Sequence, residues 1–220
     1  MSTTIPLWFL ELLYPLTPPN RTRDRPMQVL ALGLGGTGTE LLQAALLDLG
    51  YIDIYHGWHI TTNPADCVHW VRWHMAKFRG SSAERDALTS TQLDKVIGEC
   101  EAVTDLPCAG LGVEMLRAYP HAKVVLNRRS NLEGWHQSQL NTIDKVWNDW
   151  WSILRSFADS ECFWLRRAVV WCYKALFDFN VRQNGKETYR KHYAELEAEC
   201  ARSRGSGLIG MLKMAGKPNS

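Results

Sequence analysis

The chain has 220 residues, of which 45% are apolar and 22% are charged, and its formal net charge at pH 7 is +2. This composition excludes a largely disordered protein, and so small a net charge gives no support to nucleic-acid binding. The length suits one domain, or one domain with a helical appendage.

The first element is an apolar run, Ile5 to Leu16, which contains Glu11 and two prolines. It is too short to cross a bilayer, and it lacks the basic start and small-residue cleavage site of a secretory signal. We expect an amphipathic helix that packs on the protein's own core, with a membrane surface as the alternative. The six cysteines form no CxxC pair, so we expect a reduced, cytoplasmic protein without a transmembrane segment.

A proline-rich and charged stretch, Thr17 to Pro26, has the composition of a linker. It ends an N-terminal segment, residues 1–26, and separates it from a predicted domain over residues 27–220. We expect the basic cluster at residues 20–23, within this stretch, to be solvated, like the one at residues 202–204.

Apolar spacing predicts that short strands alternate with helices up to about residue 130, and that helices alone follow. The predicted strands are Met27–Leu32, Tyr51–Tyr55, Ala102–Thr104 and Ala122–Leu126. The predicted helices are Glu40–Leu49, Cys67–Phe78, Leu88–Glu99, Ala109–Tyr119, Leu132–Leu140, Thr142–Phe157, Glu161–Asn180 and Lys186–Ala201. This order of elements predicts an α/β fold, a parallel sheet with a helical cap over about residues 131–220.

A glycine-rich turn, Gly33 to Thr39, separates the first predicted strand from the first long helix. Glycines at such a place let backbone amides approach and hold a phosphate at the helix N-terminus. The spacing of Gly33 and Gly38 matches a nucleotide P-loop, but Thr39 stands where the lysine should follow. Gly33, Gly35 and Gly38 also fit a dinucleotide-binding turn, for which Asp53 would be the ribose partner. A tight turn that binds no ligand is the third interpretation.

Several segments, in a fixed order, are similar to those of one family. They are LGLGGTGTELLQAALLDLGY, YHGWH, NPADCVHW, AVTDLP and LRAYPHAKVVLNRRSNLEGW, followed by NGKETYRKHYAEL in the helical half. From about Val29 to Leu196 the chain thus resembles the fungal-type sulfotransferase-like P-loop family. The resemblance implies a three-layer α/β P-loop fold, and 3′-phosphoadenosine 5′-phosphosulfate as the donor of a sulfuryl group to a hydroxyl.

The same resemblance assigns roles to individual residues. It places the donor against Gly35, Gly36, Thr37, Gly38 and Thr39 at the 5′-phosphosulfate, and against Arg129 and Ser138 at the 3′-phosphate, with Arg128 as a rival to Arg129. Asp105 corresponds to the general base that deprotonates the acceptor, and its alternative role is to cap the following helix. His56 is the second candidate base, and its alternative is a buried, hydrogen-bonded histidine.

The chain departs from the family pattern at three places. Gly36 replaces a basic loop residue that contacts the oxygen between phosphate and sulfuryl group, and the loss of such a group typically lowers the rate about 100-fold. Ser130 replaces an acid, and the tail from Ser206 onward resembles the family's closing helix without the strand that usually precedes it. A second function therefore stays open, that of a cofactor-independent isomerase, cyclase or lyase of a fungal natural-product pathway, with Asp105 and His56 as acid and base. A binding protein without chemistry is the third.

Histidines and tryptophans form the other conspicuous groups. His69 and His74 are five residues apart, a poor spacing for zinc, so we expect no metal site. The helical spacing of the tryptophans in the predicted cap favours core packing, with an aromatic-lined substrate pocket as the alternative; they are Trp147, Trp150, Trp151, Trp164 and Trp171. We expect the partner to be a hydrophobic or aromatic small molecule, not nucleic acid, and a homodimer is left open.

Overall fold

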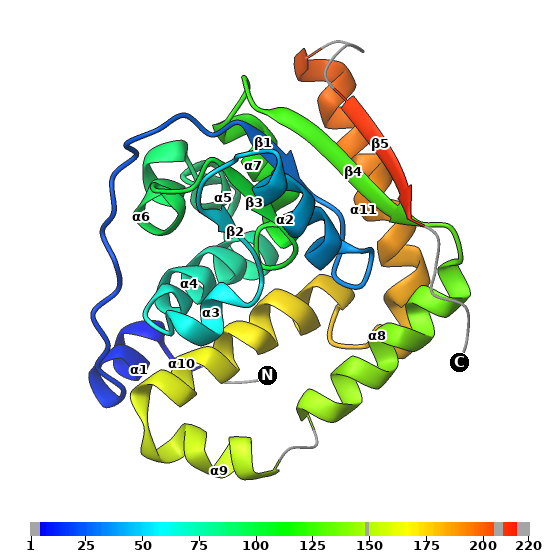
Figure 1. Ribbon diagram of the computed structural model, residues 1–220. Helices are drawn as coiled ribbons and strands as arrows, with labels where there is room; N and C mark the ends of the chain where they lie inside the picture. Colours follow the sequence, from blue (N-terminus) through cyan, green and yellow to red (C-terminus); the bar gives the residue numbers. More distant parts are fainter. Residues whose placement is uncertain (1–4, 148–149, 205–208, 215–220) are drawn as a thin grey trace.

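The computed structural model describes residues 5–147, 150–204 and 209–214 (Figure 1). Within these ranges five strands form a single parallel sheet, in the order β2-β3-β1-β4-β5. The strands are β1 (Val29–Ala31), β2 (Ile54–Tyr55), β3 (Ala102–Thr104), β4 (Lys123–Arg129) and β5 (Ile209–Met214). The parallel α/β sheet predicted from the alternation of elements is therefore confirmed.

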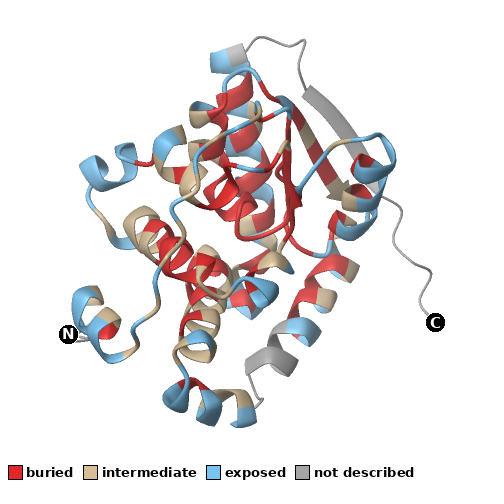
Figure 2. Cartoon of the chain, turned by 60° about the vertical axis from the view of Figure 1, so that its left-hand side comes forward, coloured by how far each residue is buried: buried red, intermediate tan, exposed pale blue. Residues whose placement is uncertain are grey.

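The side chains of each central strand alternate between the two faces of the sheet, and both faces are covered by helices (Figures 1 and 2). On β1, Val29 and Ala31 pack against α2 (Thr39–Asp48), whereas Leu30 points to the opposite face. The opposite core includes residues of α4 (Asp66–Arg79), α6 (Ser90–Ile97), α7 (Gly112–Ala118) and α11 (Val181–Arg204). This arrangement gives the three layers of the fold.

The remaining helical elements complete the helical layers on the sheet and form the cap. They are α1 (Leu7–Leu13), α3 (His59–Thr62), α5 (Ser82–Asp86), the 3₁₀ turn η1 (Ala109–Leu111), α8 (Leu132–Trp147), α9 (Trp150–Ala158), α10 (Ser160–Val169), the π-helical turn η2 (Val170–Lys174) and the 3₁₀ turn η3 (Ala175–Phe177). The predicted break in the cap near Asn141 is wrong, since α8 continues through that residue. No helix in the described ranges is both long and apolar enough to cross a bilayer.

The N-terminal helix α1 packs on the body of the protein through one face. Leu10 is buried, the ring of Tyr14 stacks on Phe163 at 3.8 Å, and the Trp164 indole donates a hydrogen bond to the Tyr14 carbonyl. Core packing is thus confirmed for this face. The outer face keeps apolar side chains exposed, among them Trp8.

The stretch from Thr17 to Pro26 lies along α6 and is tied to the body by two arginines. Arg21 donates hydrogen bonds to the buried Asp66 carboxylate at 2.8 Å and to the Val96 carbonyl. Arg23 donates to Asp94 and to three backbone carbonyls. The expectation that this basic cluster is solvated is therefore wrong for both arginines, because carbonyls at the end of α6 supply acceptors for them.

The predicted closing helix at the C-terminus is also wrong. Residues Ile209–Met214 form β5, which pairs in parallel with β4 from Val124 to Arg129. The seven-residue strand β4 would otherwise leave an unpaired edge, and the apolar run IGMLKM has the length of a strand.

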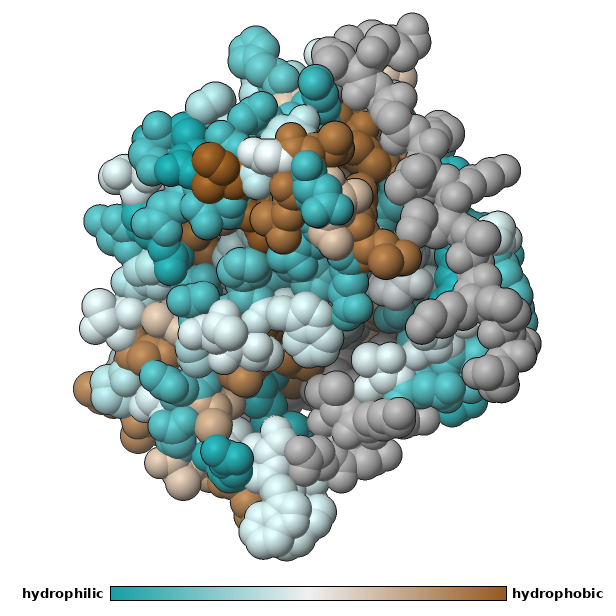
Figure 3. Space-filling view, viewed as in Figure 1, coloured by the Kyte–Doolittle hydropathy of each residue, from teal (hydrophilic) through white to brown (hydrophobic). Residues whose placement is uncertain are grey.

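Helix α2 has apolar side chains on its outer face as well as on the face that packs against the sheet. Leu42 and Leu46 are buried against the sheet, while Leu41, Leu47 and Leu49 are 68, 52 and 75% exposed. Figure 3 shows apolar side chains gathered on this side of the molecule.

Candidate functional site

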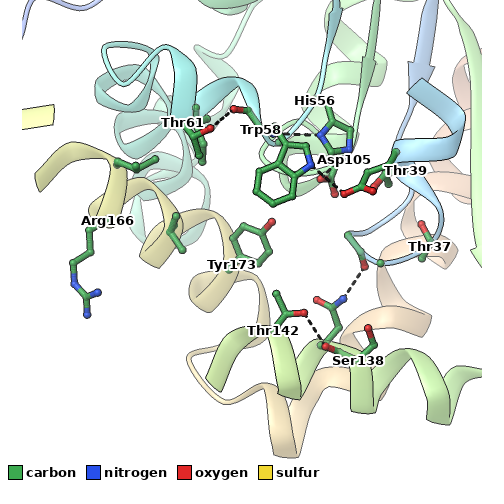
Figure 4. Close-up of a pocket in the computed structure, with 18 of the residues that line it drawn as sticks. Thr37, Thr39, His56, Trp58, Thr61, Asp105, Ser138, Thr142, Arg166 and Tyr173 are labelled. Atoms are coloured by element: carbon green, nitrogen blue, oxygen red, sulfur yellow. Dashed lines mark hydrogen bonds and ion pairs between the residues drawn. The ribbon is translucent and has the colours of Figure 1, made fainter. Parts of the chain in front are cut away.

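A cavity of about 1150 Å³ lies at the carboxyl edge of the sheet, where β1, β2 and β3 end (Figure 4). This edge is where open parallel sheets bind ligands. The wall is formed by the loops that follow these three strands, by the end of β4, and by α8, α9 and α10. The predicted cap therefore forms the outer side of the site.

The glycine-rich turn has the conformation of an anion-binding loop. Gly36 and Gly38 have φ values of 75° and 87°, a region that favours glycine. Gly38 also provides no side-chain cap for α2, so the first amides of that helix have no acceptor within the helix. The Thr37 hydroxyl faces inward instead, donating to the Leu34 carbonyl at 2.6 Å and accepting from Asn127 at 2.7 Å. The hydroxyl of Thr37 thus shapes the loop, whereas the family resemblance assigned Thr37 to the donor.

Side chains from β4 and α11 hold the loop from behind. Asn127 accepts a hydrogen bond from the Gly33 amide at 3.1 Å. The Tyr193 hydroxyl accepts from the Leu34 amide at 3.3 Å and donates to the Asn127 carbonyl at 2.6 Å. Neither Asn127 nor Tyr193 was predicted from the sequence. Asn127 has one signal there, its place at the end of the apolar run AKVVLN.

Asp105 and His56 lie together at the floor of the cavity (Figure 4). The His56 Nε2 is 3.5 Å from the Asp105 Oδ2, and both side chains are buried. Because His56 Nδ1 accepts a hydrogen bond from the Trp58 amide, the proton of a neutral imidazole is assigned to Nε2, facing the carboxyl group. Both residues were predicted as site residues from the sequence, and the fold brings them together.

Two glycines make room for the Asp105 carboxyl group. A methyl group on Gly57 would lie 2.7 Å from Oδ2, and one on Gly35 would lie 3.2 Å from Oδ1. Asp105 itself has a φ of 68°, a strained value for a residue with a side chain. The alternative role of Asp105 as a helix cap is wrong, because Cys108 is the cap residue of the following turn.

Burial shifts the proton affinities of this pair in opposite directions. Desolvation raises the pKa of Asp105 to about 7, and the negative charge of Glu40 adds to this effect. Hydrogen bonds from the Leu106 amide and the Thr39 hydroxyl act against it. Desolvation lowers the pKa of His56. At neutral pH a neutral imidazole therefore faces a carboxyl group that is present both as acid and as base, which suits proton transfer.

Next to the loop, a carboxylate lines the cavity. Glu40 lies in the first turn of α2 and lines the cavity, and the Trp58 indole donates a hydrogen bond to it at 3.1 Å. Its charge repels an anionic group at the loop.

The position of the missing basic residue is covered by a neutral amide. The indole of Trp135 and the amide of Gln139 both donate to the Gly35 carbonyl at 2.9 Å. A Cβ atom on Gly36 would lie 2.6 Å from the Gln139 nitrogen.

The two residues assigned to the 3′-phosphate do lie in the same cavity. Arg129 comes from the end of β4, and its guanidinium is 3.5 Å from the Gly36 carbonyl, while Ser138 comes from α8. The rival Arg128 points elsewhere, since it lies over the ring of Tyr193 at 4.5 Å and pairs with Glu197.

The tryptophans of the cap divide between the core and the cavity. Trp164 and Trp171 are buried, which confirms core packing for these two. Trp150 and Trp151 are 55 and 61% exposed and stack on each other, so the core interpretation is wrong for them. Helix α9 packs mainly on α10 and leaves these side chains outside. Trp151 lines the cavity, as the aromatic-pocket interpretation expects, and the side chain of Trp147 lies outside the described residues.

Three remaining candidates lie away from the site. Asp53 precedes β2 at the amino edge of the sheet and faces Arg25, so its assignment to a ribose is wrong. The rings of His69 and His74 form hydrogen bonds with the backbone carbonyls of Pro19 and Trp70, respectively. Among the described residues, no three histidine, cysteine or acidic side chains gather as metal ligands.

The sulfotransferase domain family matches residues 28–211, and the chain belongs to that family. A curated relative, Ava biosynthesis cluster protein M of Aspergillus versicolor, is 36% identical over 126 residues. The match covers 56% of this chain and 46% of the relative, so the chain spans about half the length of the relative that it matches.

Proposed function

We propose that this protein is an enzyme of small-molecule biosynthesis that moves protons on its substrate with Asp105 and His56, as an isomerase, cyclase or lyase without a group donor. The observation that carries the proposal is the buried pair itself, with Nε2 and Oδ2 3.5 Å apart at the floor of a large cavity. Membership of an enzyme family supports catalysis. The name of the Aspergillus versicolor relative supports a biosynthetic pathway.

The family's sulfuryl donor fits only part of this cavity. At its 3′ side, Arg129 offers a guanidinium suited to a phosphate, and Ser138 lies on the same wall. At its 5′ side, the loop has no basic side chain, and Gln139 covers the position where one would begin. Glu40 adds a negative charge beside an anionic group that already bears several. The phosphosulfate therefore does not fit the loop, and we assign no step to it.

The pair suits a reaction in which a proton leaves one atom of the substrate and returns to another. The Asp105 carboxylate takes the proton, and the electron pair of the broken bond moves into the substrate. The protonated Asp105, or His56 through its Nε2–H, then gives a proton back at a second position. A pKa of about 7 leaves Asp105 able to perform both halves at neutral pH.

Sulfuryl transfer is the second candidate function. It is favoured by the positions of Arg129 and Ser138 beside the loop and by the family itself. The two candidates differ in the affinity for the nucleotide that each requires.

Calorimetric titration with 3′-phosphoadenosine 5′-phosphate separates them. We expect no binding at millimolar nucleotide by the wild-type protein. Micromolar binding that is lost in Arg129→Ala would overturn the proposal in favour of sulfuryl transfer. Gly36→Arg tests whether the missing basic residue alone prevents nucleotide binding. The new side chain would displace the Gln139 amide, and a gain of binding would indicate that the rest of the donor site is intact.

A reaction assay complements the titration. The protein is incubated with a panel of aromatic alcohols, phenols and ketones, with and without the sulfuryl donor, and the products are identified by mass spectrometry. The proposal expects products that form without the donor and that disappear in Asp105→Asn. Addition of SO₃ to a substrate, dependent on the donor, would refute it.

A further inference from the structure

The cap supplies a phenol, Tyr173, to the cavity. Helix α10 and the π-helical turn η2 place one stripe of side chains, at spacings of three and four residues, along the cavity. The stripe consists of Cys162, Leu165, Arg166, Val169 and Tyr173. In Figure 4 the Tyr173 ring projects from this turn into the cavity, with its hydroxyl toward Asp105 and Trp58.

The turn that carries Tyr173 is fixed by core contacts on its other side. Trp171 and Cys172, the two preceding residues, are buried, and the Cys172 thiol lies 3.6 Å from the His74 ring. The Arg79 guanidinium covers the Trp171 ring at 5.2 Å. A π-helical turn widens the helix locally and is often found at functional sites. These contacts hold the phenol in one place above the catalytic pair.

The Tyr173 hydroxyl keeps its proton under ordinary conditions. Burial raises the pKa of Tyr173, and the nearby charge of Asp105 raises it further. The phenol is therefore a neutral hydrogen-bond donor that faces a proton acceptor across the cavity. Leu165, Val169 and Trp151 add apolar and aromatic surface to the wall of the same cavity.

We propose that Tyr173 is a catalytic residue that holds the carbonyl oxygen of an enolisable ketone, while Asp105 takes a proton from the adjacent carbon. The substrate class is then a ring-bearing, apolar ketone. This inference rests on the function proposed above and names the substrate and the third group of the site.

The step balances without any further reagent. The C–H bond next to the carbonyl breaks, its proton goes to the Asp105 carboxylate, and its electron pair moves to the carbonyl oxygen. The hydrogen bond from Tyr173 stabilises the enolate that forms. Return of the proton from Asp105, to the same carbon or to a conjugated one, gives a stereoisomer or a double-bond isomer.

The test uses 2-tetralone, an enolisable ketone fused to an aromatic ring. Deuterium incorporation next to its carbonyl is followed by NMR in D₂O near neutral pD, and its binding is followed by the quenching of tryptophan fluorescence. We expect the wild-type protein to accelerate exchange above the buffer rate. Tyr173→Phe should lower that exchange rate about 100-fold, with only a few-fold change in affinity, because the hydrogen bond strengthens as the oxygen becomes negative.

Two control variants make the result specific. Asp105→Asn should bring exchange to the buffer rate. Tyr14→Phe, which removes a hydroxyl from a ring stacked on Phe163 outside the cavity, should exchange like the wild type. A role for Tyr173 in structure alone would change affinity and exchange together.

Each other outcome overturns a definite part of the inference. Exchange that requires Asp105 but is unchanged in Tyr173→Phe would remove Tyr173 from the site and leave the proposed function standing. If 2-tetralone binds without accelerated exchange, or does not bind, the ketone substrate class is wrong. The proposed function is then judged by the nucleotide titration and the product assay alone.

Discussion

Replacing Asp105 by asparagine should make the protein more stable at alkaline pH and leave its stability at acid pH nearly unchanged. Asp105 is 7% exposed, and burial raises the pKa of its carboxyl group from 3.8 to about 7. In the unfolded chain the same group ionises near its ordinary value. The folded protein therefore binds more protons than the unfolded one between these pH values, and its stability falls as pH rises through that window.

The size of the effect follows from the shift. This difference in pKa between the folded and unfolded states corresponds to at most about 4 kcal/mol of unfolding free energy. The wild type loses this free energy progressively from about pH 4 to about pH 7, and the loss stays constant at higher pH. Asparagine has nearly the same shape and no charge to bury, so Asp105→Asn avoids the loss. His56, whose pKa is lowered by burial, destabilises the folded state at acid pH in both proteins, and its contribution largely cancels in the comparison.

Urea unfolding at a series of pH values from about 4 to about 9 measures the difference directly. The stability advantage of Asp105→Asn should grow with pH at up to about 1.4 kcal/mol per unit and then level off. Asp48→Asn, an exposed position at the end of α2, is the matched control and should run parallel to the wild type. An advantage of Asp105→Asn that does not change with pH would refute the reasoning, since it would mean that the buried carboxyl group has an ordinary proton affinity.

Three further substitutions test the geometry of the site and its supports. Gly57→Ala should lower stability by about 1–3 kcal/mol and reduce the proposed proton-exchange activity, because its methyl group would meet the Asp105 carboxyl group at 2.7 Å. Gly50→Ala, which has open space around it, should lower stability through its backbone alone and keep the activity. Tyr193→Phe should destabilise by about 1–3 kcal/mol in urea unfolding, since the amide of Leu34 loses its acceptor, and an unchanged midpoint would contradict this. Arg21→Ala should cost about 3 kcal/mol in the same assay, because it leaves a buried carboxylate without its guanidinium, and a loss below about 1 kcal/mol would show that the residue is merely a surface group.

The sheet could be predicted because it depends on local patterns, whereas the roles of Asp105 and His56 were predicted from the family resemblance. Short apolar runs and the glycine turn define β1, and the end of β3 places Asp105 at the ligand-binding edge. The positions of His56 and Arg129 came from resemblance, and both lie in the cavity.

What the sequence did not reveal depends on contacts between distant segments. Tyr173 lies on a helix whose other face is rich in buried aromatic residues, so its pattern indicated only core packing. Residues 209–214 form a strand because β4 offers them an open edge, a fact that no local pattern contains. Likewise, Trp150 is exposed because α9 packs mainly on α10. The helical spacing of the tryptophans alone is compatible with a buried position.

The hydrogen bonds that support the glycine loop join segments that are far apart in the sequence, and this separation affects when the loop forms during folding. The bond from the Gly33 amide spans 94 residues of sequence, and those from Leu34 to Tyr193 and from His192 to Leu32 span 159 and 160. Closing such long segments is slow and entropically costly, so these contacts form late in folding. A chain that has assembled β1 to β4 but not yet docked α11 would have a sheet and a loop without its rear support. The loop therefore depends for its final shape on the docking of α11, the helix that carries Tyr193.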